Sequence, residues 1–235
     1  MHRALGEHLA ETSLARGVSA AIVARHLVKG DAPDRAATFY LEAANAARNA
    51  YQTQLAIRYY QRALSLLPEG DPQRLVGHEA LEAIYRVLGR RRERKTHLAA
   101  LRALSRQLRH PKWVAIALVR SARLDLDEGH LTHGLPTANR AAEVARAARA
   151  PSIEVEAKSL CSELLRELGN MQGALEACDE ALSVAGSHPE VPARARAEVL
   201  RTRGVLLRRL GRVNEAVEAY AEAIAVFRKC GARRQ

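Results

Sequence analysis

The sequence has few of the residues that build metal and catalytic centres. Only 4% of its 235 residues are aromatic and three are cysteine. Cys161, Cys178 and Cys230 form no C-x-x-C pair and have no histidine at metal-ligand spacing. Because Cys161 and Cys178 fall at apolar helix positions, we expect both to be small core residues. The chain also has no G-x-x-x-x-G-K-[ST], G-x-G-x-x-G, H-E-x-x-H or G-x-S-x-G motif. These absences favour a protein that is not an enzyme and that holds no cofactor and no metal.

Two small groups of polar residues are open to a chemical interpretation. Asp125, Asp127 and Glu128 have the composition of a metal or general-base cluster, yet an Asp-Leu-Asp-Glu sequence at a helix end is more often a solvated face. His130 and His133 are three residues apart across a turn, a spacing that fits either a metal site or a solvated loop. We favour the solvated interpretation for both groups.

Long apolar runs are also absent. No stretch approaches the roughly 18 apolar residues that a transmembrane helix needs. Residues 1–8 lack the apolar centre of a signal peptide. We therefore expect a cytoplasmic protein with no membrane partner.

Charge of one sign predominates in the chain. The net charge is +11 and the pI is near 10.2, which suggests nucleic acid as one class of partner. However, 32 of the 37 basic residues are Arg, and an abundance of Arg and Ala together is typical of GC-rich genes. The densest basic run, residues 90–95 (RRRERK), is predicted at a turn between helices. Its Glu and the lack of nearby aromatic residues argue against a platform for stacked bases.

What the sequence does have is nearly unbroken helical periodicity, interrupted at regular intervals by Gly, Pro and capping residues. The breaks predict twelve helices in six antiparallel pairs. The predicted pairs are 3–15 with 18–28, 33–49 with 52–67, 72–88 with 92–108, 112–128 with 131–149, 152–168 with 171–184, and 190–210 with 213–229.

The strongest pattern is a repeat with fixed offsets. Gly169 and Gly211 are 42 residues apart, and residues of the same kind follow each of them five, nine and twelve positions later. The same offsets fit when counted from Tyr51. The three sets are Ala174, Cys178 and Ala181, then Ala216, Tyr220 and Ala223, and Ala56, Tyr60 and Ala63. Two helices joined by a tight turn lie close together only where the facing side chains are small, so we expect the alanines at that contact.

These offsets resemble the tetratricopeptide repeat. Two units carry the resemblance best: Ala44-x6-Tyr51-x4-Ala56-x3-Tyr60-x2-Ala63 and Gly204-x6-Gly211-x4-Ala216-x3-Tyr220-x2-Ala223. We call Tyr51, Gly89, Gly129, Gly169 and Gly211 the turn residues, and the position five residues after each one the close-packing position. The units of Gly89 and Gly129 depart from the pattern, because Arg94 and Gly134 occupy the close-packing position. The resemblance implies an all-α fold, a right-handed α-solenoid of about six antiparallel helix pairs.

The predicted organisation is a single solenoid over residues 1–235. It comprises an N-terminal capping helix pair (1–30), five repeats (33–229) and a tail (230–235). The turn residues are 38, 40, 40 and 42 residues apart, whereas the compact repeat has a period of about 34. This longer period resembles the repeat regions of large signal-transduction ATPases, including those linked to kinases. That resemblance implies that the chain is a piece or a stand-alone relative of a longer signalling protein.

In a repeat of this kind, the first helix of each pair lines the concave face. Three residues before the turn residues stand Arg48, Arg86, Leu126, Arg166 and Arg208, four arginines in five repeats. With the positions six and two residues before each turn, the candidate partner-binding residues are Asn45, Arg48, Asn49, Arg86, Arg123, Arg166, Arg208 and Arg209. Arg forks hold carboxylates by two hydrogen bonds, as in the carboxylate-clamp repeats that these positions resemble, although the Lys of those clamps is missing. Because Arg is so abundant, an alignment produced by composition alone stays open.

The sequence therefore predicts a protein–protein interaction scaffold or regulatory module. Its partner would be a protein, a peptide (an acidic one is a candidate) or another domain of a parent protein, held in a concave groove. The alternative is a nucleic-acid-binding or sensory repeat domain that uses its basic surface. Binding to nucleic acid would weaken steeply as salt is added.

Overall fold

The computed structural model describes residues 1–2, 4–9 and 19–232. These residues form helices joined by short turns, and no strand occurs among them. Residues 4–9 are helical, and the rest of the predicted helix 3–15 lies largely outside the described residues. Across the ranges given above, no helix has the length and apolar character needed to cross a membrane.

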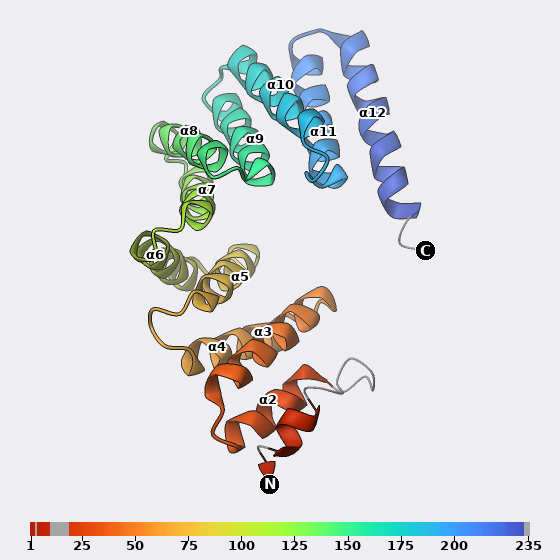
Figure 1. Cartoon of the computed structure of the whole chain (residues 1–235). Helices are drawn as coiled ribbons and strands as arrows, with labels where there is room; N and C mark the ends of the chain where they lie inside the picture. Colours follow the sequence, from red (N-terminus) through yellow and green to blue (C-terminus); the bar gives the residue numbers. More distant parts are fainter. Residues whose placement is uncertain (3, 10–18, 233–235) are drawn as a thin grey trace. The chain divides into compact units, whose positions relative to one another are not determined.

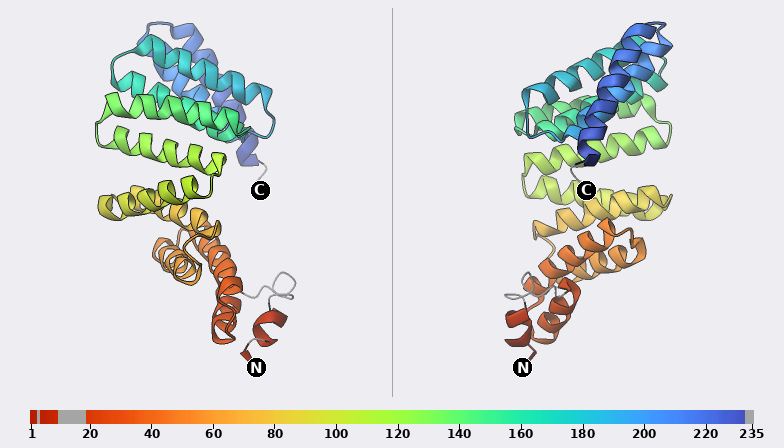
Figure 2. Two further views of the ribbon diagram at one scale, coloured as in Figure 1. Left: turned by 60° about the vertical axis from the view of Figure 1, so that its left-hand side comes forward. Right: turned by 90° about the vertical axis from the view of Figure 1, so that its right-hand side faces the viewer.

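The chain divides into two compact units, Met1–Leu108 and Arg109–Gln235 (Figure 1). The helices of the first unit are α2 (Ala20–Lys29), α3 (Pro33–Asn49), α4 (Thr53–Leu66), α5 (Gln73–Val87) and α6 (Arg91–Gln107). Those of the second are α7 (Pro111–Asp127), α8 (Leu131–Ala147), α9 (Pro151–Glu167), α10 (Met171–Ser187), α11 (Ala193–Arg209) and α12 (Val213–Ala232). Within each unit the helices stack as antiparallel pairs, which Figure 2 shows for α9 to α12. The fold is the all-α helical-repeat type that the sequence predicts, whereas a single continuous array over both units stays a prediction.

The predicted helix boundaries agree with the structure to within about two residues at most ends. The largest differences are three residues, at the end of α10, at the end of α12 and at the start of α11, which begins at Ala193 instead of residue 190. His188 and Val191 close a turn there through a backbone hydrogen bond of 3.0 Å, and Pro192 stands at the N-cap. The helix before this turn, α10, continues to Ser187, three residues beyond its predicted end.

The turn residues end the first helix of each pair in a left-handed conformation. Gly89, Gly129, Gly169 and Gly211 have φ values between 68° and 82°. Tyr51 adopts φ 58° at the same position of its own pair, although it carries a Cβ atom. Its successor, Gln52, donates its backbone N–H to the carbonyl of Ala47 at 2.9 Å, which closes the helix end as a glycine turn does.

The alanines of the repeat lie where two paired helices come closest. The six predicted contact alanines are at most 2% exposed: Ala56, Ala63, Ala174, Ala181, Ala216 and Ala223. Gly204 is part of the same contact, because a Cβ atom at this position would lie 2.7 Å from the Tyr220 ring. Cys161 and Cys178 are buried as predicted, and burial raises the pKa of the Cys161 thiol to about 11.

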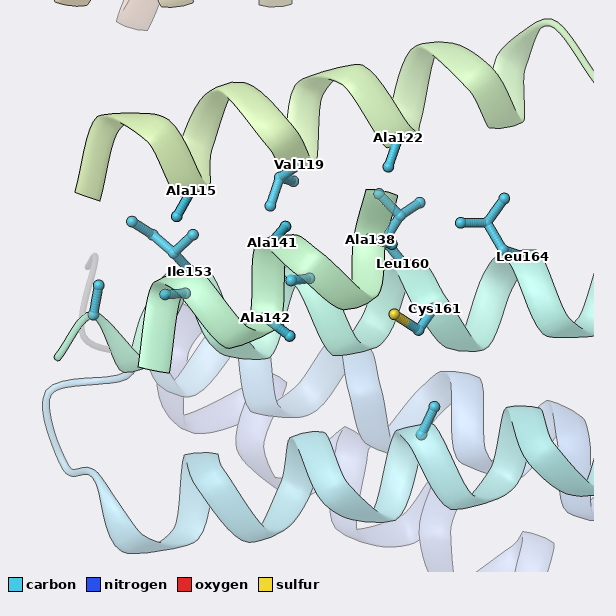
Figure 3. Close-up of a cluster of buried hydrophobic side chains, with 14 residues drawn as sticks. Ala115, Val119, Ala122, Ala138, Ala141, Ala142, Ile153, Leu160, Cys161 and Leu164 are labelled. Carbon is cyan, nitrogen blue, oxygen red and sulfur yellow. The ribbon is translucent and has the colours of Figure 1, made fainter. Parts of the chain in front are cut away.

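Figure 3 shows a further alanine-rich core between α7, α8 and α9. Ala115, Ala122, Ala138 and Ala141 are completely buried there, and Leu160 fills space beside them. Small side chains allow the helix backbones to approach closely, so the contact needs few large aromatic residues. This packing accounts for the low aromatic content of the chain.

The two close-packing positions without alanine, 94 and 134, are packed in different ways. At Gly134, a Cβ atom would lie 3.0 Å from a methyl group of Leu164 and 3.1 Å from the Cβ of Asp125. Gly134 thus allows an even closer approach than alanine would. Arg94 is 4% exposed, and its Nε donates a hydrogen bond of 2.7 Å to Oε1 of the fully buried Glu82. The large side chain fits because α5 supplies its counter-charge.

Candidate partner-binding face

The first helices of successive pairs bring equivalent repeat positions together. Arg123 of α7 stands six residues before Gly129, and Glu163 of α9 stands six residues before Gly169. The Arg123 guanidinium binds the Glu163 carboxylate through two hydrogen bonds, one of them 3.1 Å between Nη2 and Oε1. Within the second unit, therefore, side chains at equivalent positions are direct neighbours. We call the surface that these first helices share the first-helix face.

A groove of about 420 Å³ lies on this face of the second unit. Residues of α9 and α11 form most of its lining, and Arg123 of α7 contributes one end. Val155 and Val199 make an apolar part of the lining, while Ser159 and Thr202 add small hydroxyl groups. The Ser159 hydroxyl donates to the carbonyl of Val155 and the Thr202 hydroxyl to that of Glu198, so their oxygens remain as acceptors.

The charged groups of the groove are paired with one another. Glu156 accepts a hydrogen bond of 2.7 Å from Arg120, and Arg201 donates one of 3.1 Å to Glu198. Together with the pair of Arg123 and Glu163, these contacts place each guanidinium beside a carboxylate. The charges lining the groove are thus balanced, whereas the aligned arginines by themselves predict a row of positive charges.

In the first unit, the predicted binding residues are largely at the surface. Arg48, Asn49 and Arg86 are exposed. Asn45 is half-buried, and its Oδ1 accepts a hydrogen bond of 2.6 Å from the Tyr60 hydroxyl. Asn45 therefore helps to position a core residue of its own helix pair.

In the second unit, the predicted residues fall into two groups. Arg208 and Arg209 are exposed at the end of α11. Arg123 is bound to Glu163, and Arg166 donates a hydrogen bond of 2.5 Å to its neighbour Glu167. Some of the aligned arginines are therefore exposed and others are paired with glutamates, and their role in binding stays a prediction.

The groove acids were absent from the predicted set of binding residues. A signal for them exists in the sequence, since Arg123 and Glu163 carry opposite charges at equivalent positions of adjacent repeats. Glu156 and Glu198 likewise share the position thirteen residues before a turn glycine. The acids thus recur at fixed repeat positions, as the arginines do.

The basic run at residues 90–95 is less available than its sequence indicates. Arg94 points into the first unit and binds Glu82. Arg90 is paired with Glu93, and its guanidinium lies 5.1 Å from the centre of the Tyr85 ring. Only part of the run therefore contributes free charge, which weakens the alternative of a nucleic-acid-binding surface at this turn.

The polar clusters near residue 130 are connected by a hydrogen bond. The exposed His133 ring lies 2.8 Å from Oδ2 of Asp125. Among the residues that the structure describes, no group of three or more His, Cys, Asp or Glu is arranged to hold a metal ion.

A comparison with family models matches residues 154–229 to the tetratricopeptide repeat. A search of curated proteins gives no match. Among solved structures, the chain is similar to BtubC from P. vanneervenii, with a TM-score of 0.72 and 15% identity over 95% of this chain and 92% of that one.

Two longer proteins have similar folds. A Rap protein complexed with competence and sporulation factor has a TM-score of 0.70 at 17% identity, and the match covers 81% of this chain and 53% of that one. A signal transduction ATPase with numerous domains from Pyrococcus horikoshii, which has a tetratricopeptide repeat sensor, has a TM-score of 0.70 at 14% identity. That match covers 97% of this chain and 34% of the other. The chain thus spans about half of the Rap protein and a third of the ATPase.

Proposed function

We propose that this chain, a tetratricopeptide-repeat protein, binds a protein or peptide partner on its first-helix face. The groove of the second unit carries this proposal, because residues at equivalent positions of successive first helices line it. Its volume of about 420 Å³ accommodates a few side chains of a partner. Packed helices hold the groove in shape before binding, so little conformational entropy is lost when the partner enters.

The chemistry of the groove favours a partner segment with small apolar side chains flanked by polar groups. The exposed Pro192 and the half-buried Ala195 provide apolar contact, and the hydroxyl oxygens of Ser159 and Thr202 accept hydrogen bonds from the backbone N–H groups of a peptide. The paired charges at the rim are matched by a peptide that is neutral at its centre. Acidic residues of the partner would find their cations at Arg208 and Arg209, which are exposed at the end of α11 in the same unit.

We further propose that the chain has a signalling role in the cytoplasm. One similar structure contains a Rap protein together with competence and sporulation factor, and another is a signal transduction ATPase with a repeat sensor. By analogy, we propose that the chain serves as the regulatory or sensory module of a larger signalling protein. Its partner is then a separate peptide or protein, or another domain of the same polypeptide.

The groove is tested by selecting peptides from a random display library on the full chain and measuring their affinity by calorimetry. Thr202→Trp fills the groove, and Thr132→Trp makes the same change at an exposed position of α8. We expect the first substitution to weaken a selected peptide by about tenfold or more and the second to have no effect. Selected peptides that bind both variants equally well would remove the groove from the proposal.

The role of the arginines needs a separate comparison. Arg48→Glu/Arg86→Glu reverses two charges on the first-helix face, and Arg102→Glu/Arg106→Glu reverses two exposed charges on α6. If acidic peptides bind along the aligned arginines, the substitutions at Arg48 and Arg86 should lower peptide affinity several-fold more than those on α6. This difference in affinity should become smaller as salt is added. Equal effects of the two pairs would assign the binding to net charge alone.

A further inference from the structure

A second pocket lies in the first unit, between α2 and α4, the second helices of two successive pairs. Its volume is about 400 Å³. Arg25 and Lys29 project from one face of α2, four residues apart, and Arg62 comes from α4. Ile22, Val28 and Tyr40 supply apolar lining. The pocket therefore combines a cationic rim with an apolar and aromatic interior.

Within the part of the chain that the structure describes, the cations of this pocket have no acidic partner. No carboxylate occurs among the described residues that line the pocket, and none of Arg25, Lys29 and Arg62 forms an ion pair with the described part of the chain. Elsewhere, arginines that lie beside a cavity are neutralised, as Arg123 is by Glu163. Three like charges around one cavity repel each other, and a multiply charged anion between them would relieve that repulsion.

Tyr40 adds a directional group to the pocket. Its side chain is only 7% exposed, and its ring packs against Tyr59 with 5.9 Å between the ring centres. The Tyr40 hydroxyl forms no hydrogen bond with any residue that the structure describes. A lining tyrosine with an unused hydroxyl is suited to donate a hydrogen bond to a ligand oxygen.

His26 completes the wall beside these groups. Its Nδ1 lies within hydrogen-bond distance of Nδ1 of His2, at 3.1 Å. The ring thereby adds polar surface next to the cations without adding an acidic group.

From this arrangement we infer that the pocket binds a compact phosphate group carrying two or more negative charges. Arg25, Lys29 and Arg62 supply charge-assisted donors, and Tyr40 supplies a neutral one. A phosphate group has three strong acceptor oxygens and nearly two negative charges, whereas a carboxylate has two oxygens and one charge. The same chemistry is offered by an inorganic phosphate or by a phosphate ester, whose organic part would lie against Ile22 and Tyr40. This site is separate from the first-helix face and independent of a protein partner.

The inference is tested by calorimetry on the full chain at low ionic strength, with pyrophosphate, adenosine diphosphate and adenosine as probes. We expect both phosphates to bind and adenosine to show no heat. Tighter binding of the diphosphate ester than of pyrophosphate identifies an ester as the ligand, and equal affinities identify an inorganic phosphate. Both results support the site, whereas the absence of binding by either phosphate would overturn it.

The variants separate the pocket from the general basic surface. Arg25→Gln/Arg62→Gln removes two rim cations, and Arg102→Gln/Arg106→Gln removes two exposed cations of the same unit from α6. The first pair should weaken pyrophosphate binding by at least about tenfold, and the second by less than about twofold. Tyr40→Phe keeps the packed ring and should cost about two- to tenfold in affinity. If the α6 pair weakens binding as much as the rim pair, the anion is held by net charge and the pocket is not its site.

Discussion

Arg94 and Glu82 form a buried ion pair, and Arg94 stands at the close-packing position where three of the other repeats have an alanine. The Nε of Arg94 lies 2.7 Å from Oε1 of Glu82, and the two side chains are 5% and 0% exposed. Ala56, Ala174 and Ala216 occupy the equivalent position in other pairs. A charged residue is tolerated at this helix–helix contact because the opposite charge accompanies it into the interior.

Removing one member of this pair should be strongly destabilising. Arg94→Ala restores the residue type of the repeat but leaves the Glu82 carboxylate buried without its counter-charge. We expect a loss of about 3–5 kcal/mol in the free energy of unfolding of the first unit. Urea denaturation followed by circular dichroism measures this change.

The double variant Arg94→Ala/Glu82→Leu provides the control. Because both charges are removed and an apolar side chain fills part of the space, its stability should return to within about 1–2 kcal/mol of the wild type. Additive losses from the two substitutions would show that the ion pair is not coupled.

The stability of the first unit should fall in mild acid because of a histidine pair, the buried His78 and the half-buried His97. Nδ1 of His78 lies 3.0 Å from Nδ1 of His97, and the Tyr85 ring stacks on His97 at 5.5 Å. Burial lowers the pKa of His78 from 6.5 to about 4, with contributions from the neighbouring His97 and Arg74. Burial also lowers the pKa of His97, although the Glu93 carboxylate acts in the opposite direction.

Stability falls with falling pH because the pKa values of these histidines are lower in the folded unit than in the unfolded chain. Above pH 6.5 both states keep these rings neutral, so their full contribution to stability is present. Between pH 6.5 and about 4 the unfolded chain binds protons that the folded unit resists, and the shift of His78 alone lowers stability by about 3 kcal/mol over this range. Unfolding midpoints in urea at pH 7.5, 6, 5 and 4.5 measure the decline.

Two variants assign this pH dependence. His78→Leu/His97→Leu should flatten the difference between pH 7.5 and 5. His188→Gln, which changes an exposed histidine, should leave it as in the wild type. An unchanged slope in the double variant would assign the acid sensitivity to other groups.

Tyr51 has a strained backbone that a glycine would relieve. Its φ is 58°, as at the turn glycines, and its side chain is 93% exposed, so little packing is lost on its removal. Tyr51→Gly should raise stability by about 0.5–1 kcal/mol, since the relief of strain exceeds the greater entropy of an unfolded glycine. Tyr51→Ala keeps a Cβ atom in the same conformation and should change little. A thermal melt of each variant tests the prediction, and a destabilised glycine variant would contradict it.

The repeat architecture could be predicted because its determinants are local or recur at fixed spacing. The turn glycines and contact alanines identify the pairs, and α3 has its predicted bounds, 33–49. The first-helix face was also predicted, since equivalent positions of stacked repeats must be neighbours.

Pairing between residues distant in sequence could not be predicted in the same way. The repeat offsets place Arg94 at a close-packing position, but they do not identify its carboxylate partner, Glu82, which lies one helix earlier. The cationic pocket could not be predicted either, because its residues are also distant in sequence. Arg25 and Arg62 lie 37 positions apart on second helices, which a search along first helices does not compare.

The substitution Gly204→Ala should change stability in opposite directions, depending on whether the Tyr220 ring is present. It lies inside α11, where alanine is intrinsically preferred by about 1 kcal/mol. A Cβ atom at this position would nevertheless lie 2.7–3.0 Å from three atoms of the Tyr220 ring, and overpacking of this kind costs about 1–3 kcal/mol. We therefore expect Gly204→Ala to destabilise the second unit by about 1 kcal/mol in urea denaturation.

In the Tyr220→Ala background the clash is absent, and Gly204→Ala should stabilise the unit by roughly the difference in helix propensity between glycine and alanine. Gly186→Ala, where a Cβ atom meets nothing within 4 Å, is the control and should be neutral or stabilising. A Gly204→Ala effect of the same sign in both backgrounds would show that Tyr220 does not set the requirement for glycine.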